Sequence, residues 1–162
     1  MPHTYTNKMK KLINSQRLAI LVALLITVLP LLSFKAGTNA QTTTVVGIAY
    51  GSMKCGNLTV QTVKGYEYAT SQTLSVKDMI SAVKSNTANK YGIEEKNVVI
   101  KTGYTSHAVI IEYKKAVSGW NCSKTLYAVG FGNSFGEAEQ HASKIRETKE
   151  GSYTVLRQIT SS

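Results

Sequence analysis

Two capped helical segments, set among runs of β-branched residues, constrain the fold of this chain most. Ser75 stands three residues before Asp78, and Ser134 stands three residues before Glu137. This is the spacing of a capping box, in which a hydroxyl and a carboxylate satisfy free amides at the start of a helix. Apolar side chains recur at helical spacing after each cap, and Gly92 provides a stop for the first segment. The sequence therefore predicts helices that begin at these two serines.

Strand-like segments occur on both sides of these helices. They are rich in β-branched and aromatic residues and cover residues 42–50, 58–69, 97–101, 108–114, 125–131 and 152–159. Residues 51–56 are predicted to form a turn, and residues 102–107 a hairpin loop. The resulting order β-β-α-β-β-β-α-β predicts an α+β fold, with both helices on one face of a mainly antiparallel sheet. No internal repeat can be aligned.

The N-terminal segment has the features of an export signal. Residues 18–34 are uncharged and apolar and follow a basic stretch; as a helix they would span about 25 Å, slightly less than a bilayer core. Thr38 and Ala40 place small residues before a cut after Ala40, so residues 1–40 are predicted to be a signal peptide. Translation is expected to start at Met9, which is followed by two lysines. The alternative is an uncleaved anchor in the inner membrane, through which the chain would stay bound after export.

Charge and composition describe what remains after such a cut. Five of the 19 basic side chains and none of the nine acidic ones precede residue 41, so the formal charge falls from +10 to +5. With 43% hydrophobic residues the chain is too apolar to be disordered. Residues 41–162 are therefore predicted to be one exported domain, periplasmic or extracellular.

Cys55 and Cys122 are the only two thiols, and both follow the predicted cut. Outside the cytoplasm a lone pair of cysteines is more often a disulfide than two free thiols. No CxxC motif favours a redox pair, and neither cysteine has a histidine beside it in the sequence. We expect a structural disulfide.

Residues 74–148 read helix, three strands, helix, an order that resembles the double-stranded-RNA-binding fold. The local match is closest at residues 130–134 (GFGNS), which lead into Glu137-Ala138 and Ala142. That family commonly places lysines after the serine, where this chain has Phe135, Gly136 and Glu139. Phosphate affinity depends on lysine and arginine. The resemblance therefore implies a shared architecture, and no nucleic-acid partner is expected.

Residues 127–155 are also similar to the C-terminal part of small exported bacterial domains of unknown function. In those domains a G-x-G-x-S turn leads into a helix containing the residues EAE and then into a short final strand. Here the turn is residues 130–134 and the helix contains Glu137-Ala138-Glu139. This resemblance implies export and does not imply an activity.

Little in the sequence points to catalysis. Glu137 and His141 share a helix face, and Tyr104 lies near His107 in the predicted hairpin, but two residues do not make a metal or acid–base site. Asp78 is the only aspartate, and paired carboxylates are therefore scarce. We assign no catalytic residue, no metal and no cofactor.

The tyrosines are the remaining distinctive feature. Tyrosine is common at recognition surfaces, although it also fits the half-buried pleat of a sheet. Tyr66, Tyr68, Tyr104 and His107 are the candidate recognition residues, because strand ends and hairpins are accessible to solvent.

The prediction for function is a small exported, non-enzymatic binding module. Its partner is expected to be a protein or a component of the cell envelope, and the sequence does not indicate an oligomeric state. The alternative is a small exported hydrolase or inhibitor-like domain that uses Tyr104 and His107.

Overall fold

Two separate three-stranded antiparallel sheets form the centre of the fold, which a computed structural model describes for residues 41–160. The first sheet has the order β2-β1-β3 and the second the order β5-β4-β6. The strands are β1 (Thr43–Cys55), β2 (Leu58–Ser71), β3 (Val98–Gly103), β4 (His107–Ala116), β5 (Ser123–Gly132) and β6 (Tyr153–Thr160). The helices are α2 (Val76–Tyr91), the short 3-10 turn η1 (Glu95–Asn97) and α3 (Phe135–Ile145).

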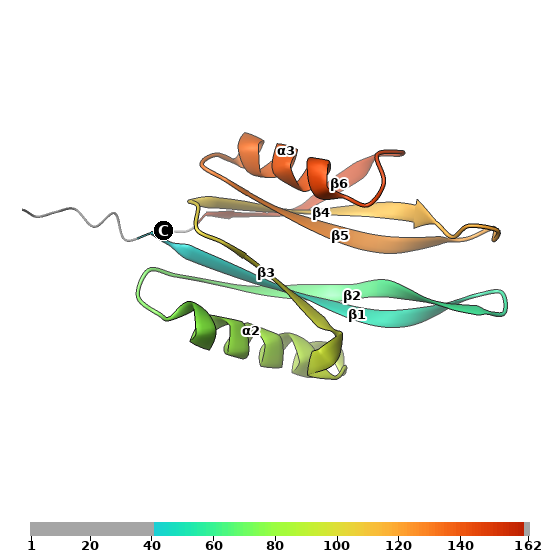
Figure 1. Cartoon of the computed structure of the whole chain (residues 1–162), viewed down its shortest axis with the longest axis horizontal. Coiled ribbons are helices and arrows are strands. Elements are labelled where there is room, and N and C mark those ends of the chain that lie inside the picture. The colour runs from blue at the N-terminus through green and yellow to red at the C-terminus, as the bar shows by residue number, and fades with distance from the viewer. Residues whose placement is uncertain (1–40, 161–162) are drawn as a thin grey trace, which may run out of the picture. The chain divides into compact units, whose positions relative to one another are not determined.

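The predicted α+β class and element order are confirmed, and the arrangement of the elements differs in one respect. Helix α2 packs on the first sheet through Met79 and Val83, and α3 packs on the second sheet through Ala138 and Ala142. The two sheets face each other, so each helix lies on the outer side of its own sheet (Figure 1). The expected single sheet with both helices on one face is thus divided into two.

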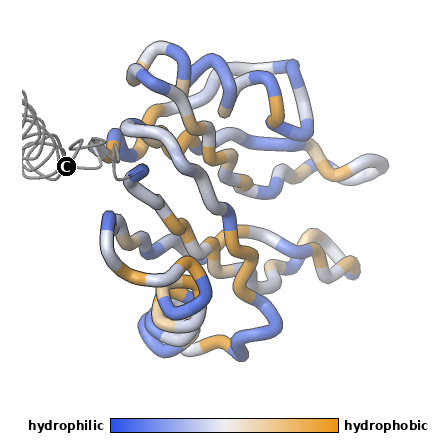
Figure 2. Tube along the Cα trace, turned by 60° about the vertical axis from the view of Figure 1, so that its left-hand side comes forward, coloured by the Kyte–Doolittle hydropathy of each residue, from blue (hydrophilic) through white to orange (hydrophobic). Residues whose placement is uncertain are grey.

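The central strands explain this division. Residues 43–49 of β1 are buried at every position, as are residues 108–111 of β4. In β1, Val45 packs under α2 while Val46 and Ile48 face the other sheet. A strand that is apolar on both faces needs cover on both faces. Hydrophobic residues accordingly recur along the strands of both sheets (Figure 2).

The two halves of the domain repeat one topology. In each half a hairpin is followed by a helix and then by a strand that returns beside the first strand of the hairpin. This repeat is not evident in the sequence because the matching elements differ in length: α2 has 16 residues and α3 has 11. The repeat is therefore visible in strand order and not in residue identity.

Two of the predicted connections are wrong. Residues 102–107 do not form a hairpin, because β3 and β4 belong to different sheets and the chain crosses between the sheets there. Residues 51–56 are mostly strand: β1 continues to Cys55, and the turn lies at Gly56, whose φ is +60°. Pairing of Gly51 through Cys55 with β2 extends the hairpin beyond the predicted strand.

Both helix starts agree with the prediction. The Ser75 hydroxyl accepts from the Asp78 amide at 3.1 Å, and the Ser134 hydroxyl accepts from the Glu137 amide at 3.2 Å. The Glu137 carboxylate accepts from the Asn133 amide, one residue before the cap, at 2.8 Å. Gly92 ends α2 with φ +61° and ψ 42°, the left-handed conformation that glycine adopts at little cost.

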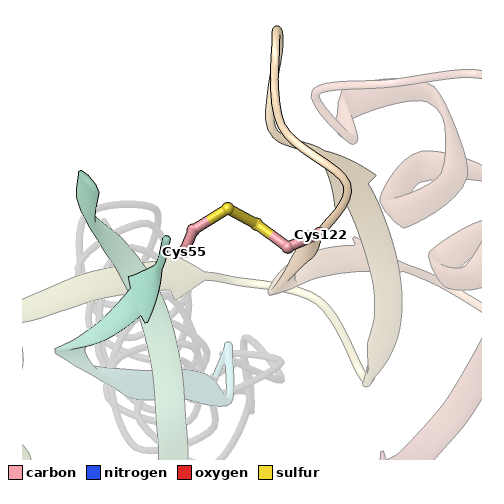
Figure 3. Close-up of a disulfide and its surroundings, with 2 residues drawn as sticks. All are labelled: Cys55 and Cys122. Carbon is pink, nitrogen blue, oxygen red and sulfur yellow. A yellow bond between two sulfur atoms is a disulfide. The ribbon is translucent and has the colours of Figure 1, made fainter. Parts of the chain in front are cut away.

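A disulfide between Cys55 and Cys122 joins the end of β1 to the loop before β5 (Figure 3), as predicted. Its 67-residue separation corresponds, in the chain-entropy model, to a stabilisation of about 4 kcal/mol. Among the described residues no helix is long and apolar enough to cross a membrane. The predicted signal peptide and the start at Met9 lie outside the described residues.

Candidate recognition groove

Two of the four tyrosine and histidine candidates line one open groove. Tyr66 and Tyr68 reach it from β2, Lys90 and Tyr91 from the end of α2, and Arg157 from β6. With Glu67 these residues enclose a volume of about 330 Å³, and we refer to this site as the tyrosine groove. Because β2 and β6 belong to different sheets, the groove exists only where the two sheets meet.

Tyr66 and Tyr91, which both line the groove, are joined by two hydrogen bonds. The Tyr91 hydroxyl donates to the Tyr66 carbonyl at 3.0 Å and accepts from the Tyr66 amide at 3.1 Å. Gly65 permits this approach, because a Cβ there would lie 2.3 Å from the Tyr91 ring. The Tyr66 ring meets the edge of Tyr127 on β5, with ring centroids 5.9 Å apart.

Tyr68 and Arg157, which also line the groove, contact each other. The Arg157 guanidinium donates to the Tyr68 hydroxyl at 2.9 Å and lies 5.6 Å from the centre of the Tyr68 ring. Both contacts hold the guanidinium in place, and Arg157 is exposed to solvent. A cation held above an aromatic ring loses little further freedom when an anion binds.

The other charges of the groove compensate each other. Lys90 makes an ion pair with Glu67, and this hydrogen bond raises the pKa of Lys90. Burial raises the pKa of Tyr66 above its ordinary value, so this hydroxyl stays neutral at physiological pH. The groove therefore presents one uncompensated positive charge, that of Arg157.

The corresponding corner of the other half is closed. There Phe131 of β5 covers Gly103 of β3, so tightly that a Cβ on Gly103 would lie 2.2 Å from the ring. Under the repeated topology this β5–β3 contact corresponds to the β2–β6 contact of Tyr68 with Arg157. Equivalent positions in the two halves thus differ in chemistry. One is filled by the apolar ring of Phe131, and the other is lined by tyrosines and by Lys90 and Arg157.

Tyr104 and His107 lie elsewhere, at the crossing from β3 to β4. The His107 ring meets the edge of Phe135 with centroids 4.5 Å apart, and its Nδ1 lies 2.9 Å from the Ser106 hydroxyl. Tyr104 is 49% exposed and its carbonyl accepts from the Gln41 side chain at 2.8 Å. The grooves described in residues 41–160 are lined by other residues.

Glu137 and His141 have structural partners. Glu137 caps α3, and His141 Nδ1 lies 3.1 Å from the Phe131 amide nitrogen and 3.2 Å from its carbonyl oxygen. Within the described part of the chain no three His, Cys, Asp or Glu side chains gather closely enough to hold a metal ion.

Sequence reasoning missed Lys90, Tyr91 and Arg157. Tyr91 looked like the last residue of a helix and Arg157 like a polar position of a final strand. Their shared role depends on a contact between residues 68 and 157, which are 89 positions apart. No local pattern reports such a contact.

Comparison with known proteins provides no relative for this chain: no family model matches it, and neither a curated protein nor a solved structure is significantly similar to it.

Proposed function

We propose that this protein is an exported, non-enzymatic binding module whose tyrosine groove takes carboxylate groups of an acidic polysaccharide of the cell envelope. The observation on which this rests is the position of Arg157, whose guanidinium lines the groove and contacts both the hydroxyl and the ring of Tyr68.

Arg157 is equipped to bind an anion. A guanidinium has five N–H donors, and the contact with Tyr68 is the one hydrogen bond that the Arg157 guanidinium makes among the described residues. It also makes none of the ion pairs found in that part of the chain. The free donors match the two oxygens of a carboxylate in a bidentate pair.

The surroundings favour a sugar polymer as the source of that carboxylate. Tyrosine rings offer an apolar face to a sugar ring and hydroxyls to its polar edge. The charge of +5 expected after export would attract a polyanion along its whole length. The disulfide is consistent with a location outside the cytoplasm.

The alternative activity, a hydrolase or inhibitor-like domain centred on Tyr104 and His107, receives less support. The His107 ring packs against Phe135, and its Nδ1 is hydrogen-bonded to the Ser106 hydroxyl. Neither His107 nor Tyr104 lines the tyrosine groove. We therefore place the function at Arg157.

Binding to a polyuronate, with neutral dextran as the comparison polymer, tests the proposal. Replacing Arg157 by glutamine is expected to weaken polyuronate binding roughly tenfold or more, because hydrogen bonds to charged groups contribute about 1.5–3 kcal/mol. Lys77→Gln is the matched control: it removes the same charge from an exposed position on α2, and its binding should stay within about twofold of the unmodified protein.

Equal losses in the Arg157→Gln and Lys77→Gln variants would show attraction by net charge alone and overturn the proposed site. Equal binding to polyuronate and dextran, or to neither, would overturn the proposed ligand.

A further inference from the structure

The sheets leave four strands at their edges, and the structure protects these edges unequally. An edge strand presents free amides and carbonyls that pair readily with another strand, and proteins normally block them. The edges are β2 and β3 in the first sheet, and β5 and β6 in the second.

The β2 and β5 edges are blocked by side chains that lie within hydrogen-bond distance of both outward backbone groups of one residue. On β2 the Tyr91 hydroxyl occupies the amide and the carbonyl of Tyr66. On β5 the His141 ring lies against both groups of Phe131. The Thr62 hydroxyl accepts from the Thr125 amide and donates to the Thr125 carbonyl, each at 3.2 Å, which joins β2 to β5.

The β6 edge is protected by its shape. Its pairing with β4 shifts register where Ile110 pairs with Arg157 and Ile111 with Val155, which leaves Leu156 as an extra residue. Such a bulge bends the strand and interrupts the regular row of outward groups.

The β3 edge has neither device. Its residues pair with β1 in an unbroken register from Val98 to Gly103. Tyr66 of β2 pairs with Ile48 of β1, and the Tyr66 backbone groups face away from β1. In such an antiparallel pair the Ile48 backbone groups also face away from β2, so they face β3 and bond Val99. By alternation Ile100 and Thr102 face outward, and no side chain of the described residues is hydrogen-bonded to their backbone.

We propose that a second copy of this chain adds to the β3 edge, so that two β3 strands pair antiparallel about a two-fold axis and join two three-stranded sheets into one. This interface goes beyond the proposed function and does not depend on it. A two-fold contact covers both free edges at once and leaves neither open to a further copy.

Lys101 disfavours one alternative register of this pairing. If Ile100 of one copy pairs with Ile100 of the other, Lys101 lies opposite Val99 and Thr102 lies opposite Val98. A register shifted by one residue in each copy would place the two Lys101 side chains directly opposite each other, where like charges repel. Val99 is 40% exposed in the single chain, and in the favoured register the Lys101 stem covers it.

Sedimentation of the protein, expressed from its full-length sequence and purified in the form that the host produces, measures this association. Proline at Thr102 removes an outward amide from β3 and leaves the ladder with β1 intact, since the Thr102 amide does not bond β1. We expect a concentration-dependent dimer for the unmodified protein and at least a tenfold weaker association for Thr102→Pro. Gln158→Pro is the matched control, because Gln158 also faces outward, but on the bulged β6 edge; its association should be unchanged.

Far-UV circular dichroism verifies that both proline variants remain folded, and amide exchange provides a second readout. In the unmodified protein the amides of Ile100 and Thr102 should become more protected as its concentration rises, while the Gln158 amide should not. A protein that stays monomeric at millimolar concentration overturns the proposal. Equal weakening by Thr102→Pro and Gln158→Pro, or concentration-independent exchange at Ile100 and Thr102, also overturns it.

Discussion

At the scale of single residues, glycine sets the distance between each helix and its sheet. A Cβ on Gly47 would lie 2.5 Å from the Thr87 hydroxyl of α2, and one on Gly130 would lie 1.9 Å from the Ala138 carbonyl oxygen of α3. The second contact is with backbone, which cannot rotate away. Gly130 therefore determines how closely α3 approaches β5.

Gly130→Ala should destabilise the protein by about 1–3 kcal/mol, since overpacking at a rigid contact forces the helix to move. Urea unfolding of the two proteins measures this difference in the free energy of unfolding. Gly136→Ala is the control, because the nearest atom to a Cβ there is 3.9 Å away and alanine favours a helix. If Gly130→Ala proves as stable as Gly136→Ala, the close approach of α3 does not depend on Gly130.

At the scale of secondary-structure elements, each helix covers the outer face of its sheet and also blocks the backbone of an edge strand from pairing with another chain. Tyr91 ends α2 and bonds the backbone of β2, while His141 extends from α3 to the backbone of β5. In the sequence Gly92 marks the end of the first helix, and His141 stands out only because it shares a helix face with Glu137. Their hydrogen bonds satisfy backbone groups that no neighbouring strand reaches.

Replacing Tyr91 by phenylalanine keeps the ring over Gly65 and removes the hydroxyl that bonds Tyr66. The free energy of unfolding should fall by about 1 kcal/mol, and the Tyr66 amide should exchange faster with solvent. Urea unfolding and amide exchange measure the two effects. The Tyr104 side chain is 49% exposed, so Tyr104→Phe should change neither quantity. An unchanged exchange rate at Tyr66 in the Tyr91→Phe protein would contradict the blocking role.

At the scale of the whole molecule, several tyrosines are packed between the two sheets or against the core of one sheet. Tyr66 and Tyr127 face each other between the two sheets, and Tyr50 and Tyr113 pack against the second sheet's core. Burial raises the pKa of all four hydroxyls, and the nearby Glu112 carboxylate adds to the increase at Tyr127. The folded domain therefore keeps protons that the unfolded chain releases at about pH 10.

This difference predicts the response to alkali. Up to about pH 10 both states are protonated, and these tyrosines make no pH-dependent contribution. As the pH rises from about 10 toward the raised folded pKa values, the unfolded state binds fewer protons than the folded state, so the free energy of unfolding should fall. Urea midpoints at about pH 9 and about pH 11, combined with tyrosinate absorbance, measure it. Full tyrosine ionisation near pH 10 in a still-folded protein would contradict the burial argument.

Local chemistry in the sequence determined the helices, the order of helices and strands along the chain, and the disulfide. Capping pairs such as Ser134 with Glu137, and runs of β-branched residues, act within one or two turns of chain and can be read from neighbours. The prediction for Cys55 and Cys122 needed only their number and the expected compartment. The runs at residues 45–49 and 108–111, which lack polar side chains, are also typical of strands that are covered on both faces.

The tertiary structure alone decided that there are two sheets, that the halves repeat one topology, and that Tyr68 meets Arg157. Each of these depends on which strands pair and stack across tens of residues, and many such arrangements fit the same local pattern. The choice among them comes from burying both faces of β1 and β4 at once, a property of the assembled core. The element order was therefore readable from the sequence, and the groove required the fold.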